Sequence, residues 1–178
     1  MKIQIRILTG NNYLLVPMTL EHITKEYIGW LNDPNVNQFL EVRNSPQTRL
    51  SVEHYINDFS QSDDKYLWAI FPVDGTLIGT VNLHSIDSYH KTCELGLMIG
   101  NIDYWGKTTS TEAISLVINF AYTELGLNRI AGGTYSSNIG MNFTFKKLGF
   151  TREGIMRLAY FDGKKFIDAW RWGLLKSE

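Results

Sequence analysis

One stretch of the sequence constrains the fold more than any other, because it reads as a strand, a long helix and a second strand in succession. Residues Thr92–Ile99 follow a strand pattern, and apolar residues recur at helical spacing over residues 108–125, before Gly126. A short strand, Arg129–Tyr135, comes next. This order predicts two neighbouring parallel strands joined by a right-handed helical crossover.

Turn residues and hydrophobic period divide the rest of the chain into further elements. Strands are predicted at residues 1–8, 13–16, 66–71 and 77–84, and in a hairpin over 150–160 and 165–175 that turns at Asp162-Gly163. Helices are predicted from Thr19 toward Trp30, from Ser51 with a cap at Ser51 or Thr48, and over 138–148, with a loop at 35–48. We therefore expect an α+β (mixed α/β) fold in a single domain, residues 1–178.

Composition excludes several classes of function. The net charge is −1 and Lys and Arg are scattered, so no basic stripe for a nucleic acid is expected. No export signal and no long apolar run are recognised, so we expect a cytoplasmic protein without a membrane partner. The single cysteine, Cys93, is predicted to be a buried structural thiol. No histidine pair has metal-ligand spacing, and no metal is expected.

The loop before the long helix is the first candidate site. Backbone N–H groups and the helix dipole at a helix N-terminus can hold a phosphate. Gly106 would let the backbone approach closely, Lys107 would add charge, and the hydroxyls of residues 108–111 would donate hydrogen bonds. The same Thr and Ser residues before Glu112 would equally serve as an ordinary helix cap.

Several ordered motifs carry a more specific resemblance. They are Glu94-Leu95-Gly96-Leu97-Met98-Ile99-Gly100, then Tyr104-Trp105-Gly106-Lys107-Thr108-Thr109-Ser110-Thr111-Glu112, then Asn138-Ile139-Gly140-Met141 with Lys147-Leu148-Gly149-Phe150, and earlier Trp30-Leu31-Asn32-Asp33-Pro34. Together they resemble the GNAT superfamily of N-acetyltransferases, in its RimJ/RimL-like branch. The resemblance implies a central twisted, mixed but mostly antiparallel sheet of about seven strands flanked by about four helices, with a V-shaped splay between Thr92–Ile99 and Arg129–Tyr135.

The same resemblance implies a donor site for acetyl-CoA. The pantetheine arm would enter the splay along the main chain of Leu97, Met98 and Ile99, and Asn138 would hydrogen-bond the arm or a nearby main-chain group. The pyrophosphate would rest on the loop that opens the helix, formed by Trp105, Gly106, Lys107, Thr108, Thr109 and Ser110. An amine would then attack the thioester directly, without a covalent enzyme intermediate.

Two residues depart from the family pattern. Thr108 stands where the family usually has glycine, and we expect helix-like dihedrals there to accept threonine without strain. Phe145 stands where many relatives have a tyrosine proposed to protonate the CoA thiolate. Phenylalanine cannot donate a proton, so either another donor replaces it or the thiolate takes its proton from water.

The candidates for the catalytic base and the acceptor site are polar residues on neighbouring segments. Glu94 is either the base or a carboxylate bonded to an adjacent strand, and strand alternation puts His84 on one face with Asn82, either in an acceptor pocket or in a structural role. Glu41 and Arg43 are either acceptor-binding or merely solvated.

The identity of the acceptor is less constrained than the donor. Residues 39–43 and 82–87 resemble the corresponding segments of GNAT proteins associated with cell-surface sugar synthesis. This resemblance implies an amino-sugar nucleotide as the small-molecule amine, with Arg43 on its phosphate. The alternatives are a protein N-terminal amine, as for ribosomal-protein enzymes, or a degenerate, non-catalytic acyl-CoA-binding module. A monomer or a homodimer is expected.

Overall fold

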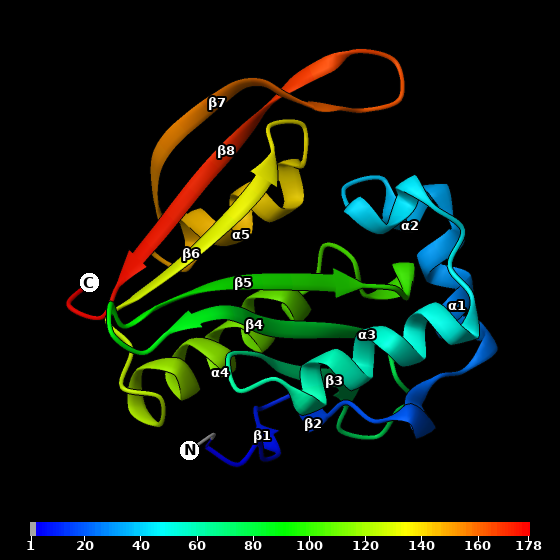
Figure 1. Cartoon of the computed structure of the whole chain (residues 1–178), viewed down its shortest axis with the longest axis horizontal. Helices are drawn as coiled ribbons and strands as arrows, with labels where there is room; N and C mark the ends of the chain where they lie inside the picture. The colour runs from blue at the N-terminus through cyan, green and yellow to red at the C-terminus, as the bar shows by residue number, and fades with distance from the viewer. Residues whose placement is uncertain (1–2) are drawn as a thin grey trace.

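The computed structural model describes residues 3–178, and within them eight strands form one sheet in the order β1-β2-β3-β4-β5-β6-β8-β7 (Figure 1). The strands are β1 (Leu8–Thr9), β2 (Tyr13–Pro17), β3 (Tyr66–Pro72), β4 (Gly79–Asp87), β5 (Thr92–Ile99), β6 (Arg129–Tyr135), β7 (Thr151–Phe161) and β8 (Phe166–Leu175). The helices are α1 (Lys25–Asn32), α2 (Pro34–Asn37), α3 (Arg49–Gln61), α4 (Thr109–Thr123) and α5 (Ile139–Lys147), with three 3-10 turns, η1 (Leu20–His22), η2 (Glu41–Asn44) and η3 (Ile102–Tyr104). The predicted α+β class and mostly antiparallel sheet are confirmed.

The N-terminal strand is much shorter than its alternating sequence predicts. Residues 1–2 lie outside the described residues, residues 3–7 form no regular secondary structure, and β1 begins at Leu8. Side chains of β3 explain the difference, because the Tyr66 hydroxyl donates to the Ile3 carbonyl and Trp68 Nε1 donates to the Arg6 carbonyl. Side chains thus bind these carbonyls where a strand would use a backbone ladder.

The first helix begins later than predicted. Thr19 precedes the 3-10 turn η1, whereas Thr24 accepts the amide of Tyr27 at 3.0 Å and caps α1. The predicted loop at 35–48 also contains α2 and η2. Of the two predicted caps, Ser51 and Thr48, the structure shows Thr48, since its hydroxyl accepts the Ser51 amide at 3.2 Å at the start of α3.

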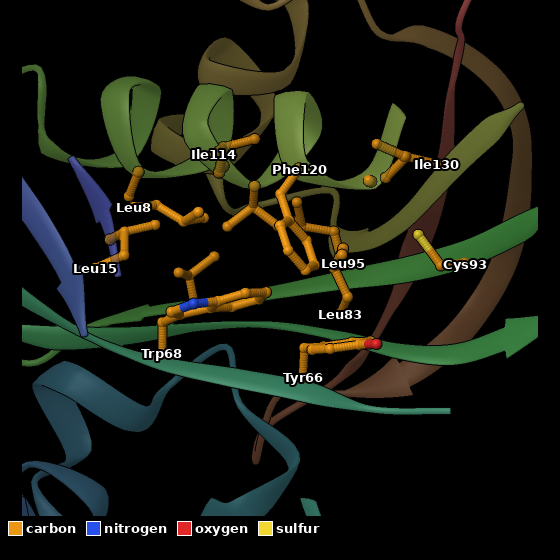
Figure 2. Packing of buried hydrophobic residues seen from close by; sticks show 14 of the residues in the cluster. Leu8, Leu15, Tyr66, Trp68, Leu83, Cys93, Leu95, Ile114, Phe120 and Ile130 are labelled. Atoms are coloured by element: carbon orange, nitrogen blue, oxygen red, sulfur yellow. The ribbon is translucent and has the colours of Figure 1, made fainter. Parts of the chain in front are cut away.

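The helices cover both faces of the sheet, and each face has its own apolar core. On one face α4 packs over the sheet, where Phe120 makes edge contacts with Tyr66 and Trp68 at ring distances of 5.4 and 5.2 Å (Figure 2). On the other face α1 and α3 pack on Leu67 and Ala69 of β3. Alternation along β3 therefore places successive side chains in different cores.

The two parallel strands separate after a short paired segment, as Figure 1 shows. β5 pairs with β6 at Thr92, Cys93 and Glu94, and beyond Glu94 no pairing between them continues in the described chain. β5 runs on to Ile99, while β6 pairs with β8 as far as Tyr135. The predicted V-shaped splay is present, and it opens toward the end of β5 from which the chain continues to α4.

Two glycines of β6 stand beside this opening. A Cβ built on Gly132 would lie 2.5 Å from Cζ of Phe145, and one built on Gly133 would lie 3.1 Å from an Arg171 guanidinium nitrogen. The absence of both side chains lets Phe145 approach the sheet from α5 and lets Arg171 cross β6 on the opposite face. Phe145 and Arg171 therefore both lie next to the splay.

Candidate active site

The loop between β5 and α4 has the backbone geometry of an anion site. Gly106 has φ +71°, a left-handed conformation that glycine adopts readily. Thr108, at the helix N-cap, has φ −75° and ψ −2°, so the expectation that threonine fits there without strain is confirmed. The first intrahelical donor is Glu112, whose amide bonds the Thr108 carbonyl at 2.8 Å. The amides of residues 109–111 lack intrahelical partners by position and point out of the helix end.

The side chains of this loop do not all serve as expected. The Thr109 hydroxyl is completely buried and bonds the Tyr13 hydroxyl at 2.8 Å and the Tyr104 carbonyl at 3.2 Å, so the expectation that it faces a phosphate is wrong. Trp105 Nε1 donates to the Ile99 carbonyl at 2.8 Å, and the Lys107 ammonium lies 5.0 Å from the Tyr104 ring centre. These contacts fix the loop, which leaves the backbone amides as its main anion-binding groups.

Main-chain groups of β5 rather than its side chains line the splay. Met98 is buried in the core under α1 and α3, whereas the half-buried Leu97 and Ile99 pack against the core under α4. Their side chains therefore alternate between the faces, and the strand edge between them is left unpaired with β6. Such an edge can bind an extended ligand as an added strand.

Asn138 has a structural role in the described contacts. Its side-chain oxygen accepts the Met141 amide at 3.1 Å and caps α5. The predicted hydrogen bond to a pantetheine arm would have to come from the remaining amide hydrogens. Phe145, further along α5, is 1% exposed and packs on Phe150 and Trp172 at ring distances of 4.5 and 5.9 Å.

A cavity of about 600 Å³ lies beside the splay, between the sheet and the elements α1, η2 and α3. Its walls come from segments far apart in the sequence and are rich in aromatic side chains, among them Tyr27, Phe39, Tyr55, Phe59, Tyr135 and Tyr160. The polar and charged groups on its walls include Glu41, Gln47, Asp58, Lys65, Thr80, Asn82, His84 and Ser85. We call this space the acceptor cavity.

Three of the predicted site residues stand together on the cavity face of the sheet. His84 lies directly opposite Glu94, and Asn82 directly opposite Gly96, in the antiparallel register of β4 and β5. A Cβ on Gly96 would lie 2.9–3.2 Å from the Asn82 side chain, so glycine makes room for that amide. The predicted alignment of Asn82 and His84 on one face is therefore present.

Asn82 and His84 present groups that suit an amine substrate. Asn82 Nδ2 donates to the Tyr55 hydroxyl at 3.3 Å, while its Oδ1 is buried without a hydrogen-bond partner in the described structure. A buried acceptor of this kind is costly unless a ligand or water satisfies it. Burial lowers the pKa of His84 from 6.5, although Glu94 opposes the shift, so the imidazole is neutral at pH 7.

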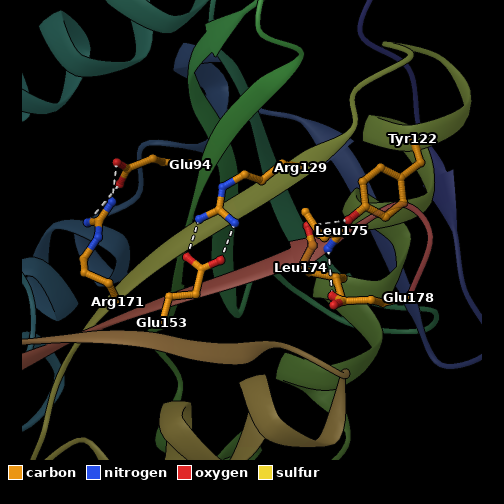
Figure 3. A network of polar contacts seen from close by, with 8 residues as sticks. All are labelled: Glu94, Tyr122, Arg129, Glu153, Arg171, Leu174, Leu175 and Glu178. Atoms are coloured by element: carbon orange, nitrogen blue, oxygen red, sulfur yellow. Dashed lines mark hydrogen bonds and ion pairs between the residues drawn. The ribbon is translucent and has the colours of Figure 1, made fainter.

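Glu94 is bound by an arginine that the sequence did not point to. Arg171, from β8, donates to the two carboxylate oxygens at 2.7 and 3.4 Å (Figure 3). Each side chain is 37% exposed, so solvent screens the pair. The alternative reading of Glu94, a carboxylate bonded to another strand, is what the contacts show, and Glu94 marks the last paired position before the splay.

Arg43 is not among the residues that line the cavity, although its neighbours Glu41 and Val42 are. Its guanidinium donates to the Tyr135 hydroxyl at 3.0 Å and to the main-chain carbonyls of Gln38 and Phe161. The Tyr135 hydroxyl donates in turn to Glu41 at 2.9 Å, and burial, with this bond, raises the pKa of Tyr135 to about 12. These contacts tie η2 to the β7–β8 hairpin. Three of its five N–H donors are engaged in these contacts, and the expectation that Arg43 binds an acceptor phosphate stays a prediction.

Cys93 is 2% exposed, and burial raises the pKa of its thiol to about 12, which confirms a structural thiol. Over residues 3–178 no group of three or more His, Cys, Asp or Glu side chains is arranged to hold a metal ion. None of the helices in that range is long and apolar enough to cross a membrane.

Comparisons with known proteins agree with this geometry. A family model described as an acetyltransferase (GNAT) domain matches residues 12–151. The uncharacterized N-acetyltransferase p20 of Bacillus licheniformis is 28% identical over 152 residues, which cover 83% of this chain and 84% of that protein.

Two solved structures share the fold. The spermidine N-acetyltransferase of Vibrio cholerae, solved with CoA and spermine, has a TM-score of 0.82 at 19% identity, covering 93% of this chain and 96% of that one. RimL, a ribosomal L7/L12 alpha-N-protein acetyltransferase solved with CoA, has a TM-score of 0.83 at 13% identity, covering 95% and 97%. At these identities the likeness concerns the fold.

Proposed function

The chain belongs to the GNAT family of acetyltransferases and is an N-acetyltransferase that uses acetyl-CoA, and we propose that its acceptor is a small primary amine held in the acceptor cavity. The observation that carries this proposal is the adjacency of the splay to the cavity: residues of β5 and β6 beyond the last paired position, Gly96, Leu97 and Gly133, line the cavity. A thioester lying in the splay would therefore meet an amine bound in the cavity.

The donor would bind mainly through main-chain groups. We propose that the pantetheine arm lies along the unpaired edge of β5 at Leu97, Met98 and Ile99, and that the pyrophosphate rests on the amides that follow Gly106. The left-handed Gly106 and the helix-like Thr108 support this arrangement, since they leave the helix end open.

The cavity favours a small acceptor over a peptide. Its volume of about 600 Å³ is in the range of small-molecule sites, and the hydrogen bonds of Arg43 to Tyr135 and Phe161 join η2 to the β7–β8 hairpin beside it, which would leave less room for an extended peptide. Asn82 Oδ1 offers a buried acceptor for an amine N–H.

Among small amines we propose an amino sugar. Its hydroxyls suit the polar wall groups Glu41 and Gln47, and its ring suits the aromatic walls. In a sugar nucleotide the phosphates would lie outside the cavity, near Arg43, which does not line it.

For the catalytic base we favour His84 over Glu94. His84 is neutral at pH 7, lines the cavity and stands opposite Glu94, whose negative charge would stabilise the imidazolium that forms. Both carboxylate oxygens of Glu94 are already engaged by Arg171. The amine nitrogen attacks the acetyl carbonyl carbon, its proton passes to His84, and the C–S bond breaks.

The test is thiol release from acetyl-CoA with three acceptor panels: amino sugars with and without a nucleotide, polyamines, and peptides with free N-termini. We expect turnover with amino sugars. Turnover with peptides alone would contradict a small acceptor, and turnover with polyamines alone would contradict the amino sugar. No turnover with any panel, despite CoA binding, would support the non-catalytic alternative.

The base assignment has its own test. His84→Gln should lower kcat by about 100-fold without changing CoA affinity. His54→Gln, on the exposed side of α3, is the matched control and should retain the wild-type rate. Wild-type turnover in His84→Gln would refute the assignment.

A further inference from the structure

The chain lacks the proton donor that would ordinarily serve the leaving thiolate. Phe145 fills that position with a ring that is 1% exposed and has no acidic hydrogen. Its tip contacts the Gly132 position from the α5 side of the sheet, where a Cβ would lie 2.5 Å from Cζ. Any replacement for the donor must therefore reach the splay from the cavity side.

Tyr160 reaches it from that side. A Cβ built on Gly133 would lie 4.0 Å from Tyr160 Oη. Gly133 belongs to the part of β6 that no longer pairs with β5, so the hydroxyl stands at the wall of the splay, and Tyr160 also lines the acceptor cavity. Within residues 3–178 the Tyr160 hydroxyl forms no hydrogen bond to another group, so it is free to donate to a ligand.

A bulge in β7 directs this side chain. Pairing passes from Met156 opposite Ala169 to Tyr160 opposite Ile167, so three residues of β7 face the single Asp168 of β8. Leu158, inside the bulge, has φ +52°, and its amide donates to the Asp168 carboxylate at 2.9 Å. Bulges of this kind change the direction of the side chains that follow.

The ring of Tyr160 is then held by stacking. It lies on the Tyr135 ring at a centroid distance of 4.4 Å and an interplanar angle of 29°. Tyr135 is itself fixed by its hydrogen bonds to Glu41 and Arg43. The position of the Tyr160 hydroxyl is thus set before any ligand binds, which favours efficient proton transfer.

A positive charge stands at the same point. One Arg171 guanidinium nitrogen lies 3.1 Å from the Cβ position of Gly133, on the side that Tyr160 also faces. A fixed cation beside the splay would stabilise negative charge as it develops on sulfur. Arg171 is kept in place by its ion pair with Glu94.

We propose that Tyr160 donates the proton to the CoA thiolate, an inference that rests on the proposed function. The amine attacks the carbonyl carbon, the tetrahedral intermediate collapses, and the electron pair of the C–S bond goes to sulfur. Sulfur takes the proton of Tyr160 Oη, while the proton lost by the amine resides on His84. Water then carries that proton from His84 to the Tyr160 phenolate, so the products are the acetamide and neutral CoA thiol.

The experiment compares Tyr160→Phe with the wild type, using an acceptor that the wild type acetylates. Phenylalanine keeps the ring on Tyr135 and removes only the proton, so kcat should fall by about 100-fold with the KM values and the CoA Kd unchanged. Replacing Tyr160 by 3,5-difluorotyrosine, a stronger acid, should retain the rate. Tyr89→Phe, at an 87% exposed position between β4 and β5, is the matched control and should match the wild type.

The outcomes separate this inference from the proposed function. Equal kcat in Tyr160→Phe and the wild type would overturn the role of Tyr160 and leave the acetyltransferase proposal intact. Equal loss with phenylalanine and with difluorotyrosine would also overturn it, because a stronger acid should then have retained the rate. A wild type that acetylates no small amine, while still binding CoA, would instead be a failure of the proposed function.

Discussion

The buried hydroxyl of Thr134 offers a quantitative test of how β6 is held beside the splay. Thr134 is 4% exposed, donates to Asn142 Oδ1 at 2.5 Å and accepts Trp172 Nε1 at 3.0 Å, so one hydroxyl joins β6, α5 and β8. Thr134→Val keeps the shape and removes both hydrogen bonds. A buried polar group left unsatisfied costs about 1–3 kcal/mol, so leaving both Asn142 Oδ1 and Trp172 Nε1 unsatisfied should cost about 2–6 kcal/mol.

That loss is large beside the roughly 5–15 kcal/mol by which a domain is usually stable. Urea unfolding followed by tryptophan fluorescence should show a lower midpoint with an unchanged slope. Thr134→Ser keeps the hydroxyl and should lose only about 1 kcal/mol for the missing methyl group. Thr151→Val makes the same change at an exposed position of β7 and should alter the free energy of unfolding by less than about 0.5 kcal/mol.

The reasoning fails if Thr134→Val is no less stable than Thr151→Val. It also fails if Thr134→Ser is as unstable as Thr134→Val, since the hydroxyl would then not be the group that matters. A changed slope would point to an altered unfolded or native state instead of two lost hydrogen bonds.

Three further predictions concern the loop, the sheet and the base. Gly106→Ala should lower the free energy of unfolding by about 1–2 kcal/mol and raise the CoA Kd, because alanine is strained at φ +71°. Thr108→Gly should leave the CoA Kd unchanged, because Thr108 already has helix-like dihedrals; calorimetry measures both Kd values. Gly132→Ala should cost about 1–3 kcal/mol in urea unfolding through its clash with Phe145, and adding Phe145→Leu should recover part of the loss. Folding lowers the pKa of His84, so the free energy of unfolding should be largest above pH 6.5 and should fall as the pH drops below that value. Because the protonated imidazole cannot act as a base, kcat/KM should decline over the same range. His84→Gln should remove this pH dependence of the free energy of unfolding.

Much of the fold could be predicted because its signals are local. The hydrophobic period located β5, α4 and β6. Because a long helix connects the two strands, a crossover was expected, and β5 and β6 are indeed parallel. Capping chemistry narrowed the cap of α3 to Thr48 or Ser51, and Thr48 is the one observed. At the N-terminus alternation alone misled, because side chains of β3 bind the carbonyls of Ile3 and Arg6. An alternating pattern does not predict which groups will hydrogen-bond to the backbone of the segment.

The sequence indicated which residues belong to the candidate site, but not which of them contact one another. Alternation put Asn82 and His84 on one face, and the motif drew attention to Glu94. No local pattern pairs Glu94 with Arg171, 77 residues later, although a lone cation in strand β8 was a signal that an acidic partner lay on another strand; that strand, β5, is not even adjacent to β8 in the sheet. The direction of Tyr160 depends on a bulge that the hairpin sequence does not reveal.

The ion pair also explains why two candidate bases stand side by side. Glu94 marks the last paired position, and its ion pair with Arg171 holds the carboxylate in place at the apex of the splay. His84, directly opposite, is neutral and faces the cavity. A fixed negative charge next to a neutral imidazole favours proton uptake by the imidazole when the amine reacts, so the pair works as a base and its counter-ion. On this reasoning Glu94, which the sequence offered as a base, supports the reaction through His84.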